Sequence, residues 1–471
     1  MPNTLAYMML LVWPLVSAIL FRRLSVSQAV TWTILGGYLI LPPVVSFVLP
    51  VLPDLDKISI PNVCAGLGFL GMRKQTFGAP KSTLIRIALA FFVLTPIGTV
   101  LTNSDFVRFA VGGLPSVSLL EIPSSILTNL VIALPALIGY QVFREERSIR
   151  ELLVALVWAG LVYSIPMLIE VRLSPQLNVW IYGFFQHAFD QMMRYGGFRP
   201  IVFLPHGLWV AFFAFMTVLS AVTLLRNEPN RRQRNFCVSV YLIVVLFLCK
   251  SANAITYVVL FVPLVLFLSS KMQVRLAAVV APIVLLYPVL RGAGWVPTGA
   301  IADFAASIDA DRAGSLIYRL VNEDMLLNHA TERPWFGWGG WGRNLVHDTA
   351  TGRLLSVVDG QWVITIGMYG WFGYLGEFGL LTLPLLLLAL RTGPKNGQIS
   401  HYAAGLALIL TANLIDLIPN ATLIPFTWLM AGALLGYGDA IKVSRASELA
   451  PPARIAPPWA KPKGLGLNEL H

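Results

Sequence analysis

Two segments of the sequence, 172–200 and 291–361, carry their positive charge as arginine alone. Arginine presents a planar fork of N–H groups that matches the oxygens of a phosphate, whereas lysine is a point charge. This composition favours an anionic partner, for which a diphosphate is a good candidate. The alternative is that single arginines reach a membrane surface or pair with nearby acids. The arginines are Arg172, Arg194, Arg199, Arg291, Arg312, Arg319, Arg333, Arg343 and Arg353.

The stretch from Asp311 to Pro334 is typical of a helix, which Pro334 ends because a residue before proline disfavours the helical conformation. Arg312 and Arg319 are two turns apart and share one face of this helix. Arg319 and Glu323 also have the i, i+4 spacing of a simple surface ion pair. Both a ligand-binding role and a structural role therefore remain open for Arg319.

A segment rich in tryptophan and glycine follows at 333–343, with the sequence RPWFGWGGWGR. Glycine permits tight backbone turns, and the tryptophans could form a floor on which sugar rings stack. The competing interpretation is an aromatic belt at a membrane interface. The tryptophans are Trp335, Trp338 and Trp341.

Long apolar runs must position these residues. Of the 471 residues, 56% are hydrophobic and 12% are charged, against roughly 25% charged in soluble proteins. Runs of about twenty apolar residues cross roughly 30 Å of hydrocarbon, and in lipid they must be helical. We expect an all-α, polytopic transmembrane bundle. Predicted spans are 4–21, 28–50, 60–72, 83–101, 124–143, 151–171, 201–225, 236–250, 252–270, 273–290, 362–390, 401–418 and 420–438.

Loop charge predicts the orientation of the bundle. With the N-terminus outside, alternate loops hold the basic clusters, as the excess of Lys and Arg on the cytoplasmic side requires. This pattern favours thirteen crossings, or twelve if the glycine-rich segment 60–72 is re-entrant. The two arginine-only segments then lie on the outer side, and loops of that length are usually functional or disordered.

The predicted organisation has four parts. Transmembrane helices occupy 1–290 and enclose an outer loop near 172–200. A large ordered outer loop follows at 291–361, and the last transmembrane helices occupy 362–440. The remainder, 441–471, is rich in Pro, Ala and Lys and is expected to be a disordered cytoplasmic tail.

Neither nucleic acid nor metal is an expected partner. The net charge of +11 is spread through short loops between apolar runs, as membrane proteins carry it. The cysteines show no metal-ligand or disulfide spacing. We therefore predict no metal and no cofactor.

Three motifs resemble, in order and spacing, those of the O-antigen ligase and O-antigen polymerase superfamily, which are bacterial inner-membrane glycosyltransferases. They are Arg199-Pro-Ile-Val-Phe-Leu-Pro205-His206, then Arg319 followed by Pro334-x-x-Gly337-x-Gly339, then Asp359-Gly360 followed after nine residues by Gly370-x-x-Gly373. The resemblance runs from about Arg199 to the last span. Where the ligases have His-Asn this chain has Asp359-Gly360, and Ser251-Ala252 replaces a common Ser-Arg. These departures favour a polymerase.

The resemblance implies metal-independent, inverting transfer from a polyprenyl-diphosphate-linked oligosaccharide to a sugar or glycolipid acceptor. The product would be O-antigen or exopolysaccharide, made at the periplasmic face of the inner membrane, with chain-length or export proteins as partners. Arg199 and Arg319 would hold the diphosphate, and Asp359 would accept the proton, unless it is only the N-cap of the next span. Predicted substrate-binding residues are Arg312, Arg333, Arg343, Trp335, Trp338, Trp341, His206 and His347, the two histidines also being alternative bases.

Three other functions remain as alternatives. One is ligase-type transfer to a lipid or another acceptor. A transporter of lipid-linked glycans is the second, but it should place ionisable residues at mid-span, facing a pathway. Such residues are few here, the candidates being Arg86, Glu377 and Asp416. A membrane scaffold is the third, and it would not need two long outer loops whose cations are all arginine.

Overall fold

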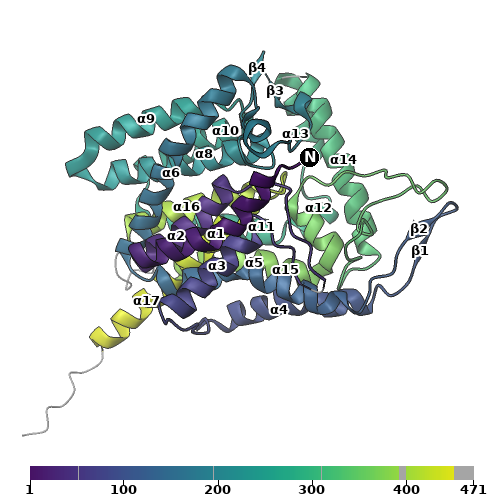
Figure 1. Cartoon of the computed structure of the whole chain (residues 1–471), viewed down its shortest axis with the longest axis horizontal. Coiled ribbons are helices and arrows are strands. Elements are labelled where there is room, and N and C mark those ends of the chain that lie inside the picture. Colours follow the sequence, from purple (N-terminus) through teal and green to yellow (C-terminus); the bar gives the residue numbers. More distant parts are fainter. Residues whose placement is uncertain (51, 195, 309, 392–398, 450–471) are drawn as a thin grey trace, which may run out of the picture.

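The computed structural model describes residues 1–449 except 51, 195, 309 and 392–398, and the side chains of 308, 310–312 and 442–449 are also not described. The described chain is almost entirely helical (Figure 1), which confirms the all-α class. The helices are α1 (Thr4–Arg23), α2 (Val26–Ile40), α3 (Ser59–Leu67), α4 (Thr83–Leu101), α5 (Glu121–Val142), α6 (Glu146–Leu173), α7 (Leu177–Tyr182), α8 (Gly207–Asn227), α9 (Arg232–Leu248), α10 (Ala252–Phe267), α11 (Ser270–Leu285), α12 (Tyr287–Gly292), α13 (Thr298–Ile308), α14 (Ala310–Thr331), α15 (Gln361–Leu390), α16 (His401–Asp416) and α17 (Pro425–Leu449).

The remaining regular elements are short. Two antiparallel hairpins pair β1 (Val107–Arg108) with β2 (Gly113–Leu114) and β3 (Met193–Arg194) with β4 (Gly197–Phe198). The π-helical turn η1 (Gly68–Met72) extends α3, and η2 (Phe189–Met192) and η3 (Pro229–Arg231) are 3₁₀ turns.

Six helices in the described part of the chain are long and apolar enough to cross a membrane: α1, α4, α5, α6, α8 and α15. Other predicted spans are shorter helices. The span predicted at 28–50 ends at Ile40 as α2, because Pro42 and Pro43 follow. Helix α10 has 16 residues and is therefore only about 24 Å long. The membrane-spanning class is supported, whereas twelve or thirteen crossings and their sidedness stay predictions. In the predicted tail, α17 continues to Leu449, and 450–471 lie outside the described residues.

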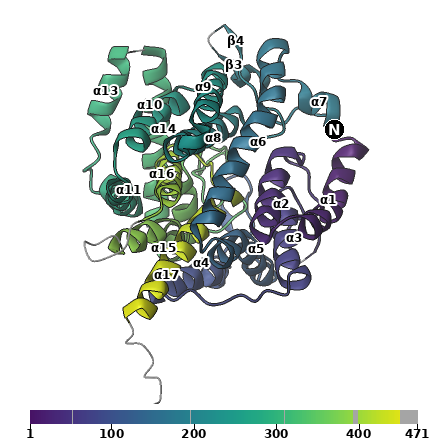
Figure 2. The same cartoon turned by 90° about the vertical axis from the view of Figure 1, so that its left-hand side faces the viewer.

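The core lies around α8 and α16. Every side chain from Val210 to Leu224 in α8 is buried, as is every one from Ala403 to Leu414 in α16. Around this centre, α1, α2 and α3 pack on one another at one side of the molecule, opposite α13 and α14 (Figure 2).

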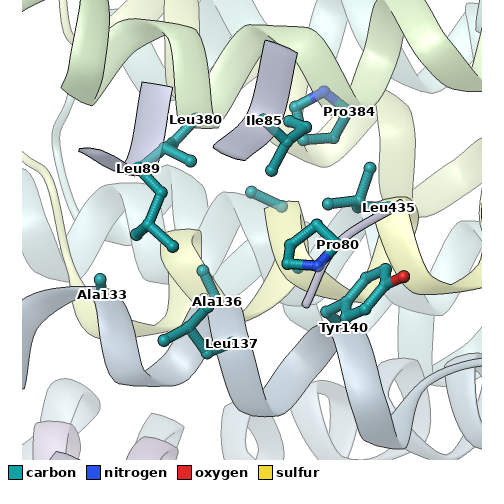
Figure 3. A pocket seen from close by; sticks show the side chains of 12 residues that line it. Pro80, Ile85, Leu89, Ala133, Ala136, Leu137, Tyr140, Leu380, Pro384 and Leu435 are labelled. Atoms are coloured by element: carbon teal, nitrogen blue, oxygen red, sulfur yellow. The ribbon is translucent and has the colours of Figure 1, made fainter. Parts of the chain in front are cut away.

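Glycines allow α5 and α17 to pack with their backbones in contact. A Cβ on Gly432 would lie 2.0 Å from the carbonyl oxygen of Ala136, and one on Gly436 would lie 2.3 Å from that of Tyr140. Small residues at such spacing permit close helix packing in membranes. Beside this contact, α4, α5, α15 and α17 enclose an apolar crevice of about 20 Å³ (Figure 3), roughly the volume of one water molecule. It offers no chemistry for a reaction.

Helix α15 is broken at Gly370, whose φ of 63° and ψ of −162° are not helical. The tryptophan–glycine segment 333–343 fills the break. The N–H groups of Trp338 and Gly339 donate to carbonyls before Gly370, at 2.8 and 2.9 Å, and the carbonyl of Pro334 accepts from the N–H of Trp371 at 2.7 Å. The backbone groups freed by the break are thus paired, as a low-dielectric surrounding requires.

Candidate functional site

A cavity of about 1000 Å³ is lined by residues of β3, the start of α10, α13 and α14. Figure 1 shows these elements towards the upper end of the molecule. The cavity walls come from segments distant in sequence, within 187–209, 250–253, 305–319, 357–359 and 420–422. Arg199, Arg319 and Asp359, predicted to be catalytic, all line it. The fold therefore brings the three together, and their catalytic roles stay predictions.

Arg319 and Asp359 form an ion pair across this cavity. The distance from Arg319 Nε to Asp359 Oδ2 is 3.4 Å, and each side chain is about one third exposed. Asp359 is not the N-cap of α15: the cap is Gly360, without a side-chain hydrogen bond. Glu323, the alternative partner of Arg319, is buried instead. The side chain of Arg312 lies outside the described residues.

Arg199 is buried, with 5% exposure, and its Nε has no hydrogen-bond partner among the described residues. Burial is the main cause that lowers its pKa, to about 10, and the positive charges of Arg194 and Arg319 act in the same direction. Buried charges are normally paired. The guanidinium is therefore prepared for an anionic ligand.

A buried carboxylate holds the irregular loop that carries Arg199. Glu170, fully buried near the end of α6, accepts hydrogen bonds from the backbone N–H groups of Leu177, Ile201 and Val202, at 3.0, 2.8 and 2.7 Å. Val202 has a φ of 51°, which is unusual for a β-branched residue. The carboxylate fixes this unusual turn and with it the direction of Arg199.

Three further side chains make hydrogen bonds to backbone groups of this loop. The Tyr163 hydroxyl accepts from the N–H of Phe203 at 3.2 Å, and Lys57 Nζ donates to the Phe203 carbonyl at 2.6 Å. Gln186 Nε2 donates to two more carbonyls, at 2.9 and 3.1 Å. Burial lowers the pKa of Lys57 to about 7. Sequence reasoning missed Lys57 and Glu170, although an ionisable residue inside an apolar span such as Glu170 is itself a signal.

His206 caps α8 and is not suited to act as a base. Its Nδ1 accepts the N–H of Leu208 at 3.0 Å, and its Nε2 lies 3.4 Å from the Gln191 side-chain oxygen. Burial and the charge of Arg199 lower its pKa to about 3. The ring is therefore neutral, with the proton on Nε2. It contacts His187, another cavity residue, with ring centroids 4.5 Å apart, and can offer a hydrogen-bond donor to a ligand.

Arg333 and Arg343 do not line the cavity. Both pair with Asp105, at 2.7 and 3.3 Å, and Arg333 stacks over Trp338 at 4.1 Å. The Arg343 side chain has no exposure and donates to the carbonyls of Asp105 and Pro115, each at 2.9 Å. A hydrogen bond from Arg333 is the main cause that lowers the pKa of Asp105. These contacts brace the tryptophan–glycine segment against the loop after α4.

The other predicted sugar-binding residues also lie away from the cavity. Trp335 and Trp341 are 62% and 68% exposed, and Trp341 Nε1 donates to Glu121 at 2.9 Å. His347 stacks on Phe109 with ring centroids 5.3 Å apart, and its Nδ1 lies 3.0 Å from a carbonyl two residues earlier. Their role in binding stays a prediction.

Arg291 anchors the helix that carries Arg319. It is 7% exposed, donates from Nη2 to Asp324 at 2.8 Å and to the Leu320 carbonyl at 3.2 Å, and its Nε lies 3.9 Å from Glu323. Burial raises the pKa of Glu323 to about 7, although Arg291 opposes the shift. This arginine, a candidate anion ligand by sequence, therefore fixes α14 in place.

A buried acid also shapes the wall at 420–422. Asp416 accepts hydrogen bonds from Tyr257, Asn420 and Thr422, at 3.1, 2.9 and 2.6 Å. A transporter would need mid-span charges that face a pathway. The carboxylate oxygens of Asp416 instead accept hydrogen bonds from loop and helix partners.

The cavity thus combines several cations with one carboxylate, so it can stabilise a negatively charged leaving group and accept a proton. In the described part of the chain, no group of three or more His, Cys, Asp or Glu is placed to hold a metal ion. No protein-family model matches this chain, and no curated protein matches it, so its function has to be inferred from these residues.

Proposed function

We propose that this chain is a multi-pass glycosyltransferase of the bacterial inner membrane that polymerises glycan repeat units carried on polyprenyl diphosphate, at the periplasmic face. The observation that carries the proposal is the gathering of Arg199, Arg319 and Asp359 in one cavity. Each belongs to a different one of the three motifs that resemble the O-antigen ligase and polymerase superfamily. Helices long and apolar enough to span a membrane support a membrane location.

In the proposed reaction, a hydroxyl of the acceptor sugar attacks the anomeric carbon of the donor sugar. The bond from that carbon to the diphosphate oxygen breaks with inversion, and its electron pair leaves with the diphosphate. The hydroxyl proton passes to the Asp359 carboxylate, a transfer typically worth about 10²–10⁴-fold in rate. Arg199 stabilises the charge that grows on the leaving group.

Arg319 has two roles in this proposal. Its ion pair with Asp359 fixes the carboxylate, and its other N–H groups remain available to a ligand. The cavity volume of about 1000 Å³ is at the upper end of the roughly 300–1,000 Å³ of small-molecule sites. That volume supports a reaction that brings two glycan ends together. Asp359 in place of the ligase histidine favours the polymerase over the ligase.

The direct test uses purified protein in lipid nanodiscs with a synthetic lipid-linked repeat unit. The expected products are longer lipid-linked chains and free polyprenyl diphosphate, with Asp359→Asn lowering the rate by about 10²-fold or more. Arg108→Gln, which removes an exposed arginine outside the cavity, is the matched control. Absence of any sugar transfer by the wild-type protein with lipid-linked donors would refute the proposal.

Deleting the gene distinguishes polymerase from ligase. A polymerase deletion leaves single repeat units and no long chains. Long chains that still assemble on the carrier, but stay unattached, would identify a ligase instead.

A further inference from the structure

The turn between α9 and α10 places a lysine at the cavity. Lys250 lines the cavity, as do the three residues that follow it. Its φ of 53° lies in the left-handed region, which is unfavourable for an L-residue with a side chain. Glycine would fit this turn better. A strained residue at a cavity suggests that the side chain has a function there.

Lys250 is held close to the β3–β4 hairpin. Its Nζ donates to the carbonyl of Arg194 at 3.2 Å. A Cβ on Gly197 would lie 2.1 Å from Nζ, so the ammonium occupies the space that a larger residue would need. Position 197 thus admits the lysine because it has no side chain.

Charge is distributed unevenly around the cavity. Of the described residues that line it, Asp359 is the single acid, and Arg319 is paired with it. Three further positive charges line the cavity, on Arg194, Arg199 and Lys250. Arg199 is only 5% exposed, and its Nε has no hydrogen-bond partner among the described residues. A ligand with more than one negative charge would balance this excess.

We propose that Lys250 joins Arg194 and Arg199 to bind a diphosphate group, while Arg319 mainly positions Asp359. The identity of the ligand as the diphosphate of a lipid-linked donor rests on the proposed function. The assignment moves the main anion contacts away from Arg319 and adds a residue that none of the three sequence motifs contains. Lysine serves here as a point charge and does not need the fork geometry of arginine.

Binding is tested without turnover. Protein in nanodiscs of zwitterionic lipid is titrated with inorganic pyrophosphate and with farnesyl diphosphate by calorimetry, at low and high salt. Lys250→Gly removes the ammonium but suits the left-handed backbone, so the variant should fold. It should bind both probes about tenfold or more weakly, and Lys250→Arg should retain most of the binding. Arg108→Gln controls for the loss of one positive charge.

A second pair of variants leaves the lysine in place. Gly197→Ala should displace the ammonium and weaken binding, whereas Gly314→Ala, where no atom lies within 4 Å of the new Cβ, should not. Arg319→Gln should bind pyrophosphate nearly as well as the wild type yet lose transfer activity. Unchanged binding in Lys250→Gly, or a greater loss in Arg319→Gln, overturns the assignment. Lys250-dependent binding of pyrophosphate by a protein that transfers no sugar would refute the proposed function and leave this site standing.

Discussion

The backbone N–H of Trp338 donates a hydrogen bond to the carbonyl of Gly367, 2.8 Å away, and so joins the tryptophan–glycine segment to the break in α15. Asn103 supports the same contact by donating to the carbonyl of Gly337 at 2.8 Å. Two of the three motifs that suggested an active site therefore contact each other. Asp359 lies two residues before the helix that they join, so the contact helps to fix its position.

Adding one methyl group should open this junction. Gly337 has a φ of 67°, and a Cβ there would lie 2.5 Å from the backbone of Met368. We expect Gly337→Ala to lower the free energy of unfolding by about 2 kcal/mol or more and to reduce activity. Gly340→Ala, in the same segment but with no atom within 4 Å of the new Cβ, is the control. Equal melting temperatures for the two variants in detergent would contradict the structural role.

Glu170→Gln should disturb the loop that carries Arg199. Glutamine has one oxygen and one NH₂ group, so it cannot accept all three backbone N–H groups that the carboxylate accepts. A buried donor left unpaired costs about 1–3 kcal/mol. Thermal unfolding should show this loss, and diphosphate binding should weaken. Glu145→Gln, at an exposed position, should change neither thermal stability nor diphosphate binding. A Glu170→Gln protein equal to wild type in both assays would show that Glu170 does not hold this loop.

Glu323 should make stability depend on pH. Its pKa is raised from 4.5 to about 7, so between these values the folded protein keeps a proton that the unfolded chain has released. Its contribution is complete below pH 4.5 and is lost as the pH rises to 7, by at most about 1.4 kcal/mol per pH unit. Melting temperatures at pH 5 and 8 should differ less in Glu323→Gln than in wild type. The control is Glu332→Gln, at an exposed position. Identical pH profiles of the melting temperature for Glu323→Gln and wild type would show that Glu323 is not the source of the pH dependence.

Arg319→Lys should lose more activity than the loss of charge would explain, because lysine keeps the charge but lacks the guanidinium whose Nε lies 3.4 Å from Asp359. Asp359→Asn should lose activity by about 10²-fold or more but remain folded, since a pair one third exposed contributes at most about 1 kcal/mol. A double-mutant cycle on turnover should show that the two losses are not additive. Fully additive losses would mean that the residues act independently.

The sidedness of the loops can be tested by cysteine labelling in intact cells. On a background without Cys64, Cys237 and Cys249, an impermeant reagent should label Thr349→Cys and should not label Arg231→Cys. Labelling of only the latter would reverse the predicted orientation.

The helices were predictable because long apolar runs specify them, whereas their ends depend on local events. Pro42 and Pro43 shorten the second helix, and a single left-handed glycine breaks α15. Such events change which helices are long enough to cross a membrane without changing the fold class.

The cavity was predictable only in part. Arg199, Arg319 and Asp359 were found because each lies in a motif with fixed spacing. Lys250 and Glu170 were not, because their positions depend on which loops meet in three dimensions. Arg333 and Arg343 were assigned to substrate from their residue type alone, which does not reveal that Asp105 lies beside both.

The close packing of α17 on α5 has a consequence for biosynthesis. Gly432 and Gly436 touch the backbone of a helix that leaves the ribosome long before them. While the intervening helices are translated, α5 has to wait in the membrane without this neighbour. This close contact between α5 and α17 can therefore form only near the end of translation, so a chain stalled before Pro425 would expose to quality-control proteases the face of α5 that α17 covers.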